Sequence, residues 1–551
     1  MGYGAITEYL DGIRDGRFTV NSLTRRAYER LTEDMDSGVY LYDGKKANKA
    51  IRFIETFCQH SKGTRGHIRL ELWQKALITA IFGTVDSDGA RHYREVFVVI
   101  ARKNGKSTLA AAIATYMAYA DGEMGAEIFF TAPKLEQADA CYSAFTQMVT
   151  REPELSALAK KRRTDIYLKD NNTTAKKLAF DKDKSDSLNI QLAVCDELGA
   201  WNPTGGNRFY QVLRSSLGAR RQPLILSITT ANYVNDGPYD RTYKRVEKWL
   251  NRASDETRLF GVIYAIEDPL KWNDIEELKK ASPNMGVSVK EDFFKEQAAA
   301  AKEDPDALVE FMIKYCNIKQ NDSHAWLRTE DVDACCSDVA ITPEMLRGSY
   351  AVGGTDLSRT TDLTAACVVV EKNGNLYVMV HFWLPSERID KLAERDHMPY
   401  RVYISRGLMD PSGEQFVDYR DVFKWFERLR TEYEIIPLVV GYDRYMASYL
   451  VNDMKETGYT TDWVFQGPNL TPVIREAEGL IRSGVVHIGN NDILRAHLLN
   501  TRLKHVSGER VQIEKNHDAD HVDGVDALLD ALTVRQKWYE QMGAYLKNEE
   551  M

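Results

Sequence analysis

The stretch Glu95-Val96-Phe97-Val98-Val99-Ile100-Ala101-Arg102-Lys103-Asn104-Gly105-Lys106-Ser107-Thr108 decides the fold of the N-terminal half of this chain. Its first part, residues 95–100, is a short run of mostly apolar, β-branched residues and predicts a buried strand. Residues 109–119, which follow the stretch, are rich in alanine and predict a helix. A strand, a tight turn and a helix in this order place backbone N–H groups and a helix N-terminus around a phosphate.

The Gly-Lys-Ser sequence in the turn predicts a nucleotide-binding P-loop. Lys106 is then expected to reach the β- and γ-phosphates of a nucleotide, and Ser107 to bind Mg²⁺. The other residues expected to line the nucleotide are Arg102, Lys103, Asn104, Gly105 and Thr108. The standard motif has a further glycine five residues before Gly105, where this chain has Ile100. The motif alone therefore leaves open an ordinary helix start that carries a Lys-Ser pair.

Two acids at the end of a second apolar strand support hydrolysis of the nucleotide. Residues 192–195 predict a buried strand that ends in Asp196 and Glu197. Because ligands bind at the carboxyl ends of parallel strands, Asp196 is predicted to hold Mg²⁺ and Glu197 to polarise the attacking water. A third apolar strand, residues 223–228, ends in Thr229-Thr230, whose hydroxyls could sense the γ-phosphate. The three strand ends together predict an ATP site, and the alternative for the two acids is a solvated turn.

The C-terminal half of the chain carries a second run of predicted strands. An apolar strand over residues 349–355 is followed by a hairpin, a later apolar strand and a helix near the C-terminus. The hairpin strands, the later strand and the helix cover residues 365–370, 376–382, 436–440 and 521–532. This order of elements predicts an RNase H-like α/β domain.

Acids stand at the ends of these predicted elements. Asp356 follows the first strand, Asp443 follows the later strand, and Asp523 lies near the start of the helix. Carboxylates on three such elements can converge and hold two divalent ions, Mg²⁺ or Mn²⁺, which clamp the attacking and leaving oxygens of a phosphodiester displacement. Each acid by itself is typical of a protein surface or a helix cap, so the prediction of a nuclease depends on the ordered set.

Together these motifs resemble the large terminase subunit of tailed bacteriophages and prophages, and the resemblance covers most of the chain. Further stretches are similar to the same family: Leu70-Glu71-Leu72-Trp73-Gln74 before Phe82-Gly83, Phe130-Thr131-Ala132-Pro133 with Gln137-Ala138, and Ala281-Ser282-Pro283-Asn284 with Trp326-Leu327. The implied fold is α/β: a P-loop NTPase domain with a RecA/ASCE-like parallel sheet, followed by an RNase H-like α/β nuclease domain.

The resemblance also implies roles for individual residues. A missing first P-loop glycine is usual in this family, in which a basic residue inside the loop, here Arg102, contacts the phosphates. Gln74 matches the glutamine that reads adenine, and Thr229-Thr230 match the motif that couples hydrolysis to movement. The metal-binding acids of the nuclease are matched by Asp356, Asp443 and Asp523.

The choice among neighbouring acids stays open in the nuclease site. Asp362 lies six residues beyond Asp356, and Asp526 lies one helical step beyond Asp523, so either could replace its neighbour as a metal ligand. The family-like Val-Asp-Gly-Val-Asp-Ala-Leu pattern favours Asp523. The nearby His517 and His521 could assist a metal or a phosphate, and ordinary polar loop residues are the alternative.

The function implied by the resemblance is the packaging of DNA. ATP hydrolysis would drive double-stranded viral DNA into a procapsid, and a metal-dependent endonuclease would cut the concatemeric DNA. Implied partners are the small terminase subunit and the portal protein, on which the chain is expected to form a homo-oligomeric ring in the host cytoplasm. A ring motor supplies an arginine to its neighbour's ATP, and the unranked candidates are Arg208, Arg214, Arg220 and Arg221.

The composition agrees with this interpretation. A chain of 551 residues, 44% hydrophobic and 28% charged, should hold at least two domains. No stretch approaches the ~20 uninterrupted apolar residues of a membrane helix, so no membrane contact is expected. Seven cysteines without a paired Cys-x-x-Cys predict reduced core thiols rather than zinc ligands. A net charge of −9 argues against broad DNA wrapping but leaves room for a local basic groove, for which residues 160–163 and 220–221 are candidates.

Four regions are predicted along the chain. Residues 1–60 are expected to form a helical segment, which we interpret as a cap on the ATPase rather than a docking module. The P-loop ATPase domain should cover residues 61–265, a helical linker or lid residues 266–345, and the nuclease domain residues 346–551.

Two other classes of protein are alternatives at this stage. A chromosomal helicase or translocase with a second domain that only binds DNA would show no metal-dependent cleavage. A transposase-like recombinase would instead join DNA ends.

Overall fold

A computed structural model gives the fold in two compact units, residues 1–320 and residues 321–551. It describes residues 2–61, 63, 66–132, 138–178, 188–203, 205–234, 237–320, 325–358, 363–396, 398–443, 448–515 and 520–548. The division at residue 320 falls inside the predicted linker region 266–345. The predicted domain boundaries stay predictions.

The first unit is built on an eight-stranded sheet, counted over the described residues, with the strand order β10-β3-β9-β8-β4-β7-β6-β5. Strands β10 to β7 in this order are parallel, and β6 and β5 continue antiparallel at the edge. The strands are β3 (Glu95–Val99), β4 (Glu127–Thr131), β5 (Ala159–Lys161), β6 (Asp165–Leu168), β7 (Thr174–Leu178), β8 (Ile190–Asp196), β9 (Leu224–Thr229) and β10 (Leu259–Ile263). Because β9 lies between β3 and β8, the three predicted functional strand ends meet at one edge of the sheet.

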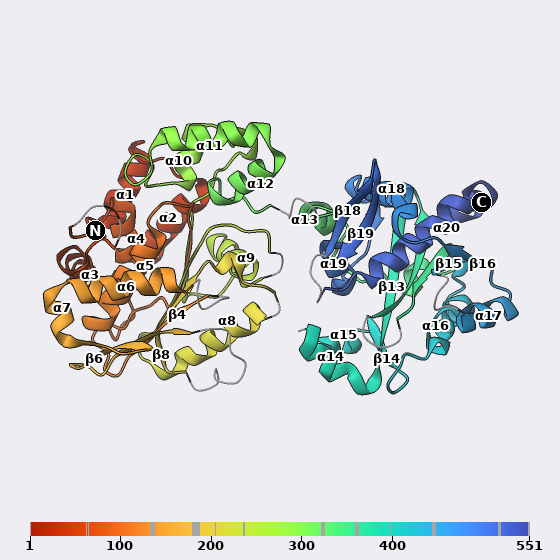
Figure 1. Ribbon diagram of the computed structural model, residues 1–551, viewed down its shortest axis with the longest axis horizontal. Coiled ribbons are helices and arrows are strands. Elements are labelled where there is room, and N and C mark those ends of the chain that lie inside the picture. The colour runs from red at the N-terminus through yellow and green to blue at the C-terminus, as the bar shows by residue number, and fades with distance from the viewer. Residues whose placement is uncertain are drawn as a thin grey trace. The chain divides into compact units, whose positions relative to one another are not determined.

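Helices cover this sheet and supply the rest of the core of the first unit (Figure 1). They are α1 (Ala5–Arg14), α2 (Ser22–Asp36), α3 (Gly44–Phe57), α4 (Leu72–Gly83), α5 (Lys106–Tyr119), α6 (Asp139–Arg151), α7 (Pro153–Leu158), α8 (Gly205–Ser215), α9 (Pro238–Leu250), α10 (Ile275–Ala281), α11 (Glu291–Glu303) and α12 (Pro305–Lys314). The short strands β1 (Leu41–Tyr42) and β2 (Thr84–Val85) pair antiparallel. One-turn 3₁₀ segments are η1 (Leu198–Ala200), η2 (Ser216–Ala219) and η3 (Pro269–Lys271).

The N-terminal helices pack on the sheet rather than standing apart from it. The Asn21 side chain caps α2 by accepting a hydrogen bond from the Thr24 N–H. Its amide also donates to the carbonyls of Ile263 and Ala265 at 2.9 and 3.0 Å, which fixes α2 against β10. Side chains of α1 and α2 are buried in the same hydrophobic core as β3 and β10. The segment is therefore a structural part of the first unit.

The second unit is built on a mixed sheet with the order β14-β13-β12-β11-β15-β16, and β17 pairs with β13. β11, β12 and β13 are antiparallel neighbours, whereas β15 and β16 run parallel to β11. The strands are β11 (Tyr350–Asp356), β12 (Thr364–Lys372), β13 (Asn375–Pro385), β14 (Met409–Ser412), β15 (Ile436–Asp443), β16 (Thr461–Val464) and β17 (Val486–His487). A separate hairpin joins β18 (Thr501–Ser507) to β19 (Arg510–Lys515).

The long C-terminal helix of the second unit lies across this sheet (Figure 1). The helices are α13 (Thr329–Ala334), α14 (Ile389–Asp396), α15 (Tyr400–Ser405), α16 (Tyr419–Glu432), α17 (Ser448–Glu456), α18 (Thr471–Arg482), α19 (Asp492–Leu499) and α20 (Asp523–Leu546), with 3₁₀ segments η4 (Pro343–Leu346), η5 (Ser386–Arg388) and η6 (Gly467–Leu470). Two glycines allow the close approach of α20. A Cβ on Gly354 of β11 would lie 2.1 Å from the Ala527 carbonyl oxygen, and one on Gly441 of β15 would lie 2.5 Å from that of Asp530.

The predicted fold class is confirmed in both units. The predicted strands and hairpin of the C-terminal half are present, whereas the helix predicted at 521–532 begins at Asp523 and continues to Leu546. The antiparallel edge β5–β7 and the hairpin β18–β19 were not predicted. The cysteines, which the sequence predicts to be reduced core thiols, form no disulfide with one another, and all except Cys336 are buried. Within the described part of the chain, no helix combines the length and apolar character needed to cross a membrane.

Candidate functional sites

The predicted P-loop has a backbone shaped for an anion. Lys103 and Gly105 both adopt left-handed conformations, with φ of 68° and 77°, and α5 begins directly afterwards at Lys106. Successive backbone N–H groups in such turns converge on a concave anion-binding surface, and the helix N-terminus adds to it. A non-glycine residue rarely adopts φ near 68°, so the conformation of Lys103 must be held by its surroundings.

Lys106 is a buried cation without a hydrogen-bond partner among the described residues. Its side chain is 8% exposed, and Nζ lies 3.7 Å from Glu197 Oε1, which is an ion pair beyond hydrogen-bond distance. Burial lowers the pKa of Lys106, and the carboxylates of Glu197 and Asp196 oppose that change. An ammonium group placed in this way lacks hydrogen-bonding partners that a phosphate would provide. The residues present therefore fit a phosphate group.

Asp196 and Glu197 at the end of β8 are brought beside Lys106, as predicted. Asp196 is 4% exposed and accepts hydrogen bonds from the Cys141 thiol and the Glu197 N–H, both at 3.1 Å. Burial and the neighbouring Glu197 raise the pKa of Asp196 to about 6. Glu197 itself has φ of 49°, a left-handed conformation that turns the chain sharply at the strand end. Because ionising the buried Asp196 carboxylate costs free energy, a cation bound beside it would stabilise its charged form.

The two predicted coupling threonines have different environments. The Thr229 hydroxyl is fully buried, accepts from the Gly199 N–H at 2.9 Å and donates to the Thr230 carbonyl at 2.7 Å. The Thr230 hydroxyl instead donates weakly, at 3.5 Å, to Glu197 Oε2. Thr230 therefore brings the end of β9 into contact with Glu197, the carboxylate that is predicted to polarise water.

The remaining predicted nucleotide residues lie in the loop, in the first turn of α5 and on α4. Arg102 is exposed, and its positive charge lowers the pKa of Lys106, so the two cations lie close together. Ser107 and Thr108 are half-buried in the first turn of α5. Gln74 is 8% exposed on α4, where its Oε1 accepts from the Glu71 N–H at 3.0 Å in a capping box.

The three predicted nuclease acids meet at one end of the second sheet. Asp356 ends β11 and Asp443 ends the adjacent parallel strand β15, while Asp523 begins α20, which packs on both strands. Burial raises the pKa of Asp356 well above its usual range, and four neighbouring carboxylates contribute to the same effect. These neighbours are Asp526, Asp523, Asp530 and Asp443.

Two further acids of α20 belong to this cluster. Burial and Asp523 raise the pKa of Asp526 to about 7. Burial also raises the pKa of Asp530 well above its usual range, although Asp530 accepts a hydrogen bond from Gln466 Nε2 at 2.8 Å. Asp530 was not predicted as a site residue. Its position four residues after Asp526, on the same helix face, is the signal in the sequence that could have identified it.

The carboxylates are not already arranged as a closed metal centre. No group of three or more histidine, cysteine, aspartate or glutamate side chains in the described residues has metal-ligating geometry. The proposed alternative ligand Asp362 lies outside the described residues. Clustered carboxylates with raised pKa values nevertheless fit a divalent cation, because the cation would offset their mutual repulsion.

Asp523 interacts with a histidine, which in turn interacts with a further carboxylate. His521 lies between two acids, with Nδ1 3.1 Å from Asp523 Oδ2 and Nε2 3.1 Å from Asp396 Oδ2. The hydrogen bonds to Asp396 and Asp523 overcome the effect of burial and raise the pKa of His521 to about 9. Asp396 also accepts from the Tyr400 hydroxyl at 2.8 Å. His521 is thus fixed in orientation, whereas the other predicted histidine, His517, lies outside the described residues.

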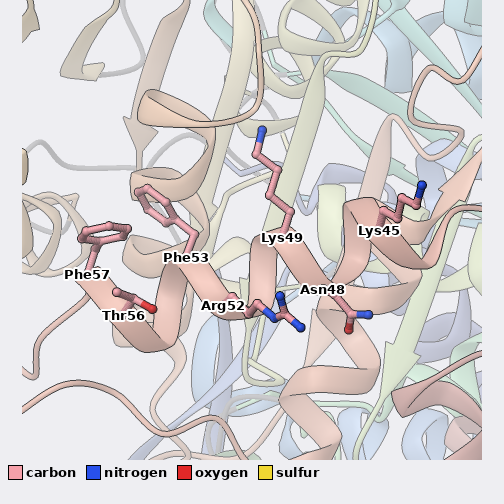
Figure 2. Close-up of a pocket in the computed structure, with 7 residues that line it drawn as sticks. All are labelled: Lys45, Asn48, Lys49, Arg52, Phe53, Thr56 and Phe57. Atoms are coloured by element: carbon pink, nitrogen blue, oxygen red, sulfur yellow. The ribbon is translucent and has the colours of Figure 1, made fainter.

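Of the two predicted basic runs, residues 160–163 are exposed on the first unit, and a further basic face lies on α3. The Arg220 guanidinium donates a hydrogen bond to the Met124 carbonyl at 2.7 Å, so this arginine already has a partner within the first unit. A shallow surface pocket is lined entirely by α3, and Figure 2 shows its side chains along that helix. The lining residues are Lys45, Asn48, Lys49, Arg52, Phe53, Thr56 and Phe57. No basic run in the sequence indicates this face, because its cations are spaced along the helix rather than adjacent.

The arginine candidates for a role in a neighbouring subunit also differ in their surroundings. Arg214 forms ion pairs with Glu95 and Glu256 at 3.2 and 3.3 Å. Arg221 pairs with Asp88 at 3.3 Å. Arg208 is exposed on α8. These positions do not assign the role to any of them.

The fold and the two clusters define a P-loop ATPase joined to an RNase H-like endonuclease. Residues 72–248 match the family described as "Terminase large subunit, ATPase domain", and residues 253–537 match "Terminase large subunit, endonuclease domain". The chain therefore belongs to the terminase large subunit family. It is an ATPase and endonuclease of a phage DNA-packaging motor, and it uses a nucleotide and a divalent metal.

Individual relatives agree with the family assignment. The terminase large subunit of Enterobacteria phage HK97 is 25% identical over 501 residues, which cover 88% of this chain and 94% of that protein. Protein YmfN of Escherichia coli (strain K12) is 27% identical over 363 residues, covering 63% of this chain and 78% of that protein. The crystal structure of the HK97 bacteriophage large terminase matches the fold with a TM-score of 0.50 and 22% identity, over 89% of this chain and 99% of that one.

Proposed function

We propose that the strand ends of β3, β8 and β9 form the site of ATP hydrolysis, with Lys106 as the group that holds the β- and γ-phosphates. The observation that carries this assignment is the buried Lys106 ammonium without a hydrogen-bond partner in the described residues, next to two acids. Ser107 and Asp196 would hold Mg²⁺, which supplies charge neutralisation of the phosphates. Glu197 would orient and polarise the attacking water, and Arg102 would add a cation to the loop.

Thr230 supports a link between hydrolysis and movement. Its hydroxyl contacts Glu197 Oε2, so a change at the γ-phosphate that moves Glu197 would be felt at the end of β9. Thr229 would hold that strand end in place through its two hydrogen bonds. Gln74 would contact the adenine base after releasing its cap contact with Glu71. These roles would couple ATP hydrolysis to translocation of double-stranded DNA.

In the second unit, we assign DNA cleavage to the acid cluster at the ends of β11 and β15. Asp356, Asp443 and Asp523 would hold two Mg²⁺ or Mn²⁺ ions, with Asp526 and Asp362 as alternative ligands. When bound, the ions would activate water and stabilise the leaving oxygen of the phosphodiester. His521 would keep the Asp523 carboxylate in position, because it is held in turn by Asp396.

The partners follow from the family rather than from a surface seen here. The small terminase subunit would deliver viral DNA, and the portal protein would anchor a homo-oligomeric ring of this chain on the procapsid. The ring would work in the host cytoplasm. The basic face of α3 would be one place where a phosphate backbone can approach a chain of net charge −9.

Two variants of the full chain test the two sites together. Lys106→Ala should abolish ATP turnover and keep metal-dependent cleavage of supercoiled plasmid, whereas Asp356→Ala should do the reverse. Asp410→Ala, which removes an exposed carboxylate from the same sheet as Asp356, is the matched control and should keep both activities. Near-wild-type ATP turnover in Lys106→Ala, or joint loss of both activities in a folded Asp356→Ala, would contradict the assignment.

A further inference from the structure

A segment that runs from the end of α10 toward α11 forms hydrogen bonds with the P-loop. We call residues 281–288 the loop strap. The Ala101 N–H donates to the Ala281 carbonyl at 3.2 Å, and the Ser288 hydroxyl donates to the Lys103 carbonyl at 2.7 Å. The second contact lies at the residue with the unfavourable φ of 68°. The strap therefore contributes to holding the loop in its anion-binding shape.

Asn104 is the loop residue that forms several hydrogen bonds with the strap. It is fully buried, and its amide nitrogen donates to the Ala101 and Arg102 carbonyls at 3.1 and 3.2 Å. The same nitrogen lies 2.9 Å from Ser282 Oγ in the strap. Its Oδ1 accepts from the Asn284 N–H at 2.9 Å. The Asn104 side chain thus holds the shape of the loop through hydrogen bonds with the loop itself and with the strap.

Asn284 joins the loop to a second element of the site. It is 5% exposed, and its Nδ2 donates to the Asn104 carbonyl at 3.3 Å. Its Oδ1 accepts from Trp73 Nε1 at 2.7 Å. Trp73 lies in the first turn of α4, directly before Gln74. One buried amide side chain therefore bridges the loop that would hold the phosphates and the helix that would contact the base.

From this geometry we propose that Asn284 is a positioning residue for nucleotide binding, which fixes the spacing between the P-loop and the first turn of α4. The proposal rests on the nucleotide site proposed above. Asn284 does not touch the reacting atoms. It acts through Asn104 on one side and through Trp73 on the other, so its loss should weaken ATP binding more than it slows the chemical step.

The test compares Asn284→Ala with the wild-type full chain in two measurements. One is the Kd of a fluorescent ATP analogue with Mg²⁺, and the other is KM and kcat for ATP turnover. Removing both hydrogen bonds of the side chain should raise Kd and KM about tenfold, equivalent to about 1.4 kcal/mol. The change in kcat should be smaller. An unchanged Kd and KM would overturn the proposal.

A double-mutant cycle separates a bridge from two unrelated contacts. Trp73→Phe keeps the ring contact with Tyr264 but removes the indole N–H that Asn284 accepts. If the bridge matters, Trp73→Phe should also raise Kd, and the double variant should be little worse than Asn284→Ala alone. Fully additive effects would show that α4 and the loop are not linked through this amide.

Asn21→Ala is the matched control for general loosening of the unit. Asn21 is a buried asparagine of the same unit with a comparable set of hydrogen bonds, and these bonds join α2 to β10 rather than the loop. It should lower the melting temperature and leave KM for ATP within about twofold of wild type, which corresponds to about 0.4 kcal/mol. If Asn21→Ala raises KM as much as Asn284→Ala does, the positioning role is wrong.

Lys106→Ala distinguishes failure of this inference from failure of the proposed site. If Lys106→Ala binds the analogue and turns over ATP like wild type, the nucleotide site itself is misplaced. If Lys106→Ala loses turnover while Asn284→Ala keeps wild-type Kd and KM, only the role of the strap is wrong.

Discussion

Two stacked histidines in the second unit have pKa values shifted in opposite directions. The rings of His497 and His521 lie 6.0 Å apart between centroids. His521 is held between two carboxylates, and its pKa is raised to about 9. Burial and the nearby charge of His521 lower the pKa of His497 well below its usual range. His497 Nδ1 accepts from the Gly524 N–H at 3.0 Å, a bond that a protonated ring would lose.

The neutral His497 should make the second unit sensitive to acid. Its folded-state pKa is below the unfolded value of about 6.5, so the stability it contributes is full above that pH and is lost as pH falls below it. One proton gives a slope of at most about 1.4 kcal/mol per pH unit. Urea unfolding of the full chain between pH 7 and 5 should show a shallower loss for His497→Gln than for wild type. Parallel profiles would contradict this assignment.

Glu197 should separate nucleotide binding from hydrolysis. Glu197→Gln keeps the size of the side chain and removes the charge that would polarise water, while Lys106 and the loop stay in place. ATP turnover should fall by at least about 100-fold, the lower range of general-base effects. Binding of a fluorescent ATP analogue should persist, and stopped-flow fluorescence would measure it. If Glu197→Gln instead lost analogue binding to the same degree as ATP turnover, Glu197 would have a role in nucleotide affinity.

At the scale of elements, the contact between α20 and two strands builds the acid cluster. Gly354 and Gly441 have no side chain, so the helix backbone lies directly on β11 and β15. This approach places acids of α20 near Asp356 at the end of β11. The acids at the two strand ends come from elements that are hydrogen-bonded neighbours, whereas those of α20 depend on packing alone.

Gly354→Ala should therefore damage the nuclease unit selectively. Its Cβ would lie 2.1 Å from the Ala527 carbonyl oxygen and 2.4 Å from the Ala531 nitrogen, so α20 must move. Overpacking of this kind costs about 1–3 kcal/mol. Plasmid cleavage should be lost while ATP turnover continues. Gly479→Ala on α18 is the control, because its Cβ meets nothing within 4 Å and should stabilise the helix by about 0.5–1 kcal/mol.

At the scale of the whole molecule, the chain folds as two units with separate cores and separate ligand chemistry. The first unit holds the P-loop and its strap, and the second holds the acid cluster. A ligand that binds one folded unit stabilises that unit by mass action. The two units should therefore respond to different ligands when the full chain is heated.

Calorimetry of the full chain should resolve this difference. Mg²⁺ with a non-hydrolysable ATP analogue at ~100 times its Kd should stabilise the first unit by about 2.7 kcal/mol. Mg²⁺ or Mn²⁺ alone should raise the transition of the second unit, and that rise should be absent in Asp356→Ala. EDTA should abolish cleavage. If the metal shifts both transitions equally in wild type and in Asp356→Ala, the acid cluster is not the metal site.

The sequence by itself predicted the order of the two units and most of the residues that the structure brings together in the two clusters. Lys106 was predicted from the Gly-Lys-Ser turn. Asp196 and Asp356 were predicted because an apolar run indicates a buried strand, and an acid directly after it indicates a ligand at the strand end. The same local reasoning predicted the hairpin around Asn373-Gly374, whose residues have φ of 52° and 74° as a tight turn needs.

Only the tertiary structure decided which distant side chains complete the sites. Asn104 and Asn284 are separated by 180 positions, and Trp73 and Asn284 by 211, so no local period indicates their contact. Asp530 joined the acid cluster because α20 packs on glycines of two strands, and that packing is a property of the assembled sheet. Local patterns specify elements, because propensity and burial act over a few residues. The bridges between elements depend on how close packing brings them together.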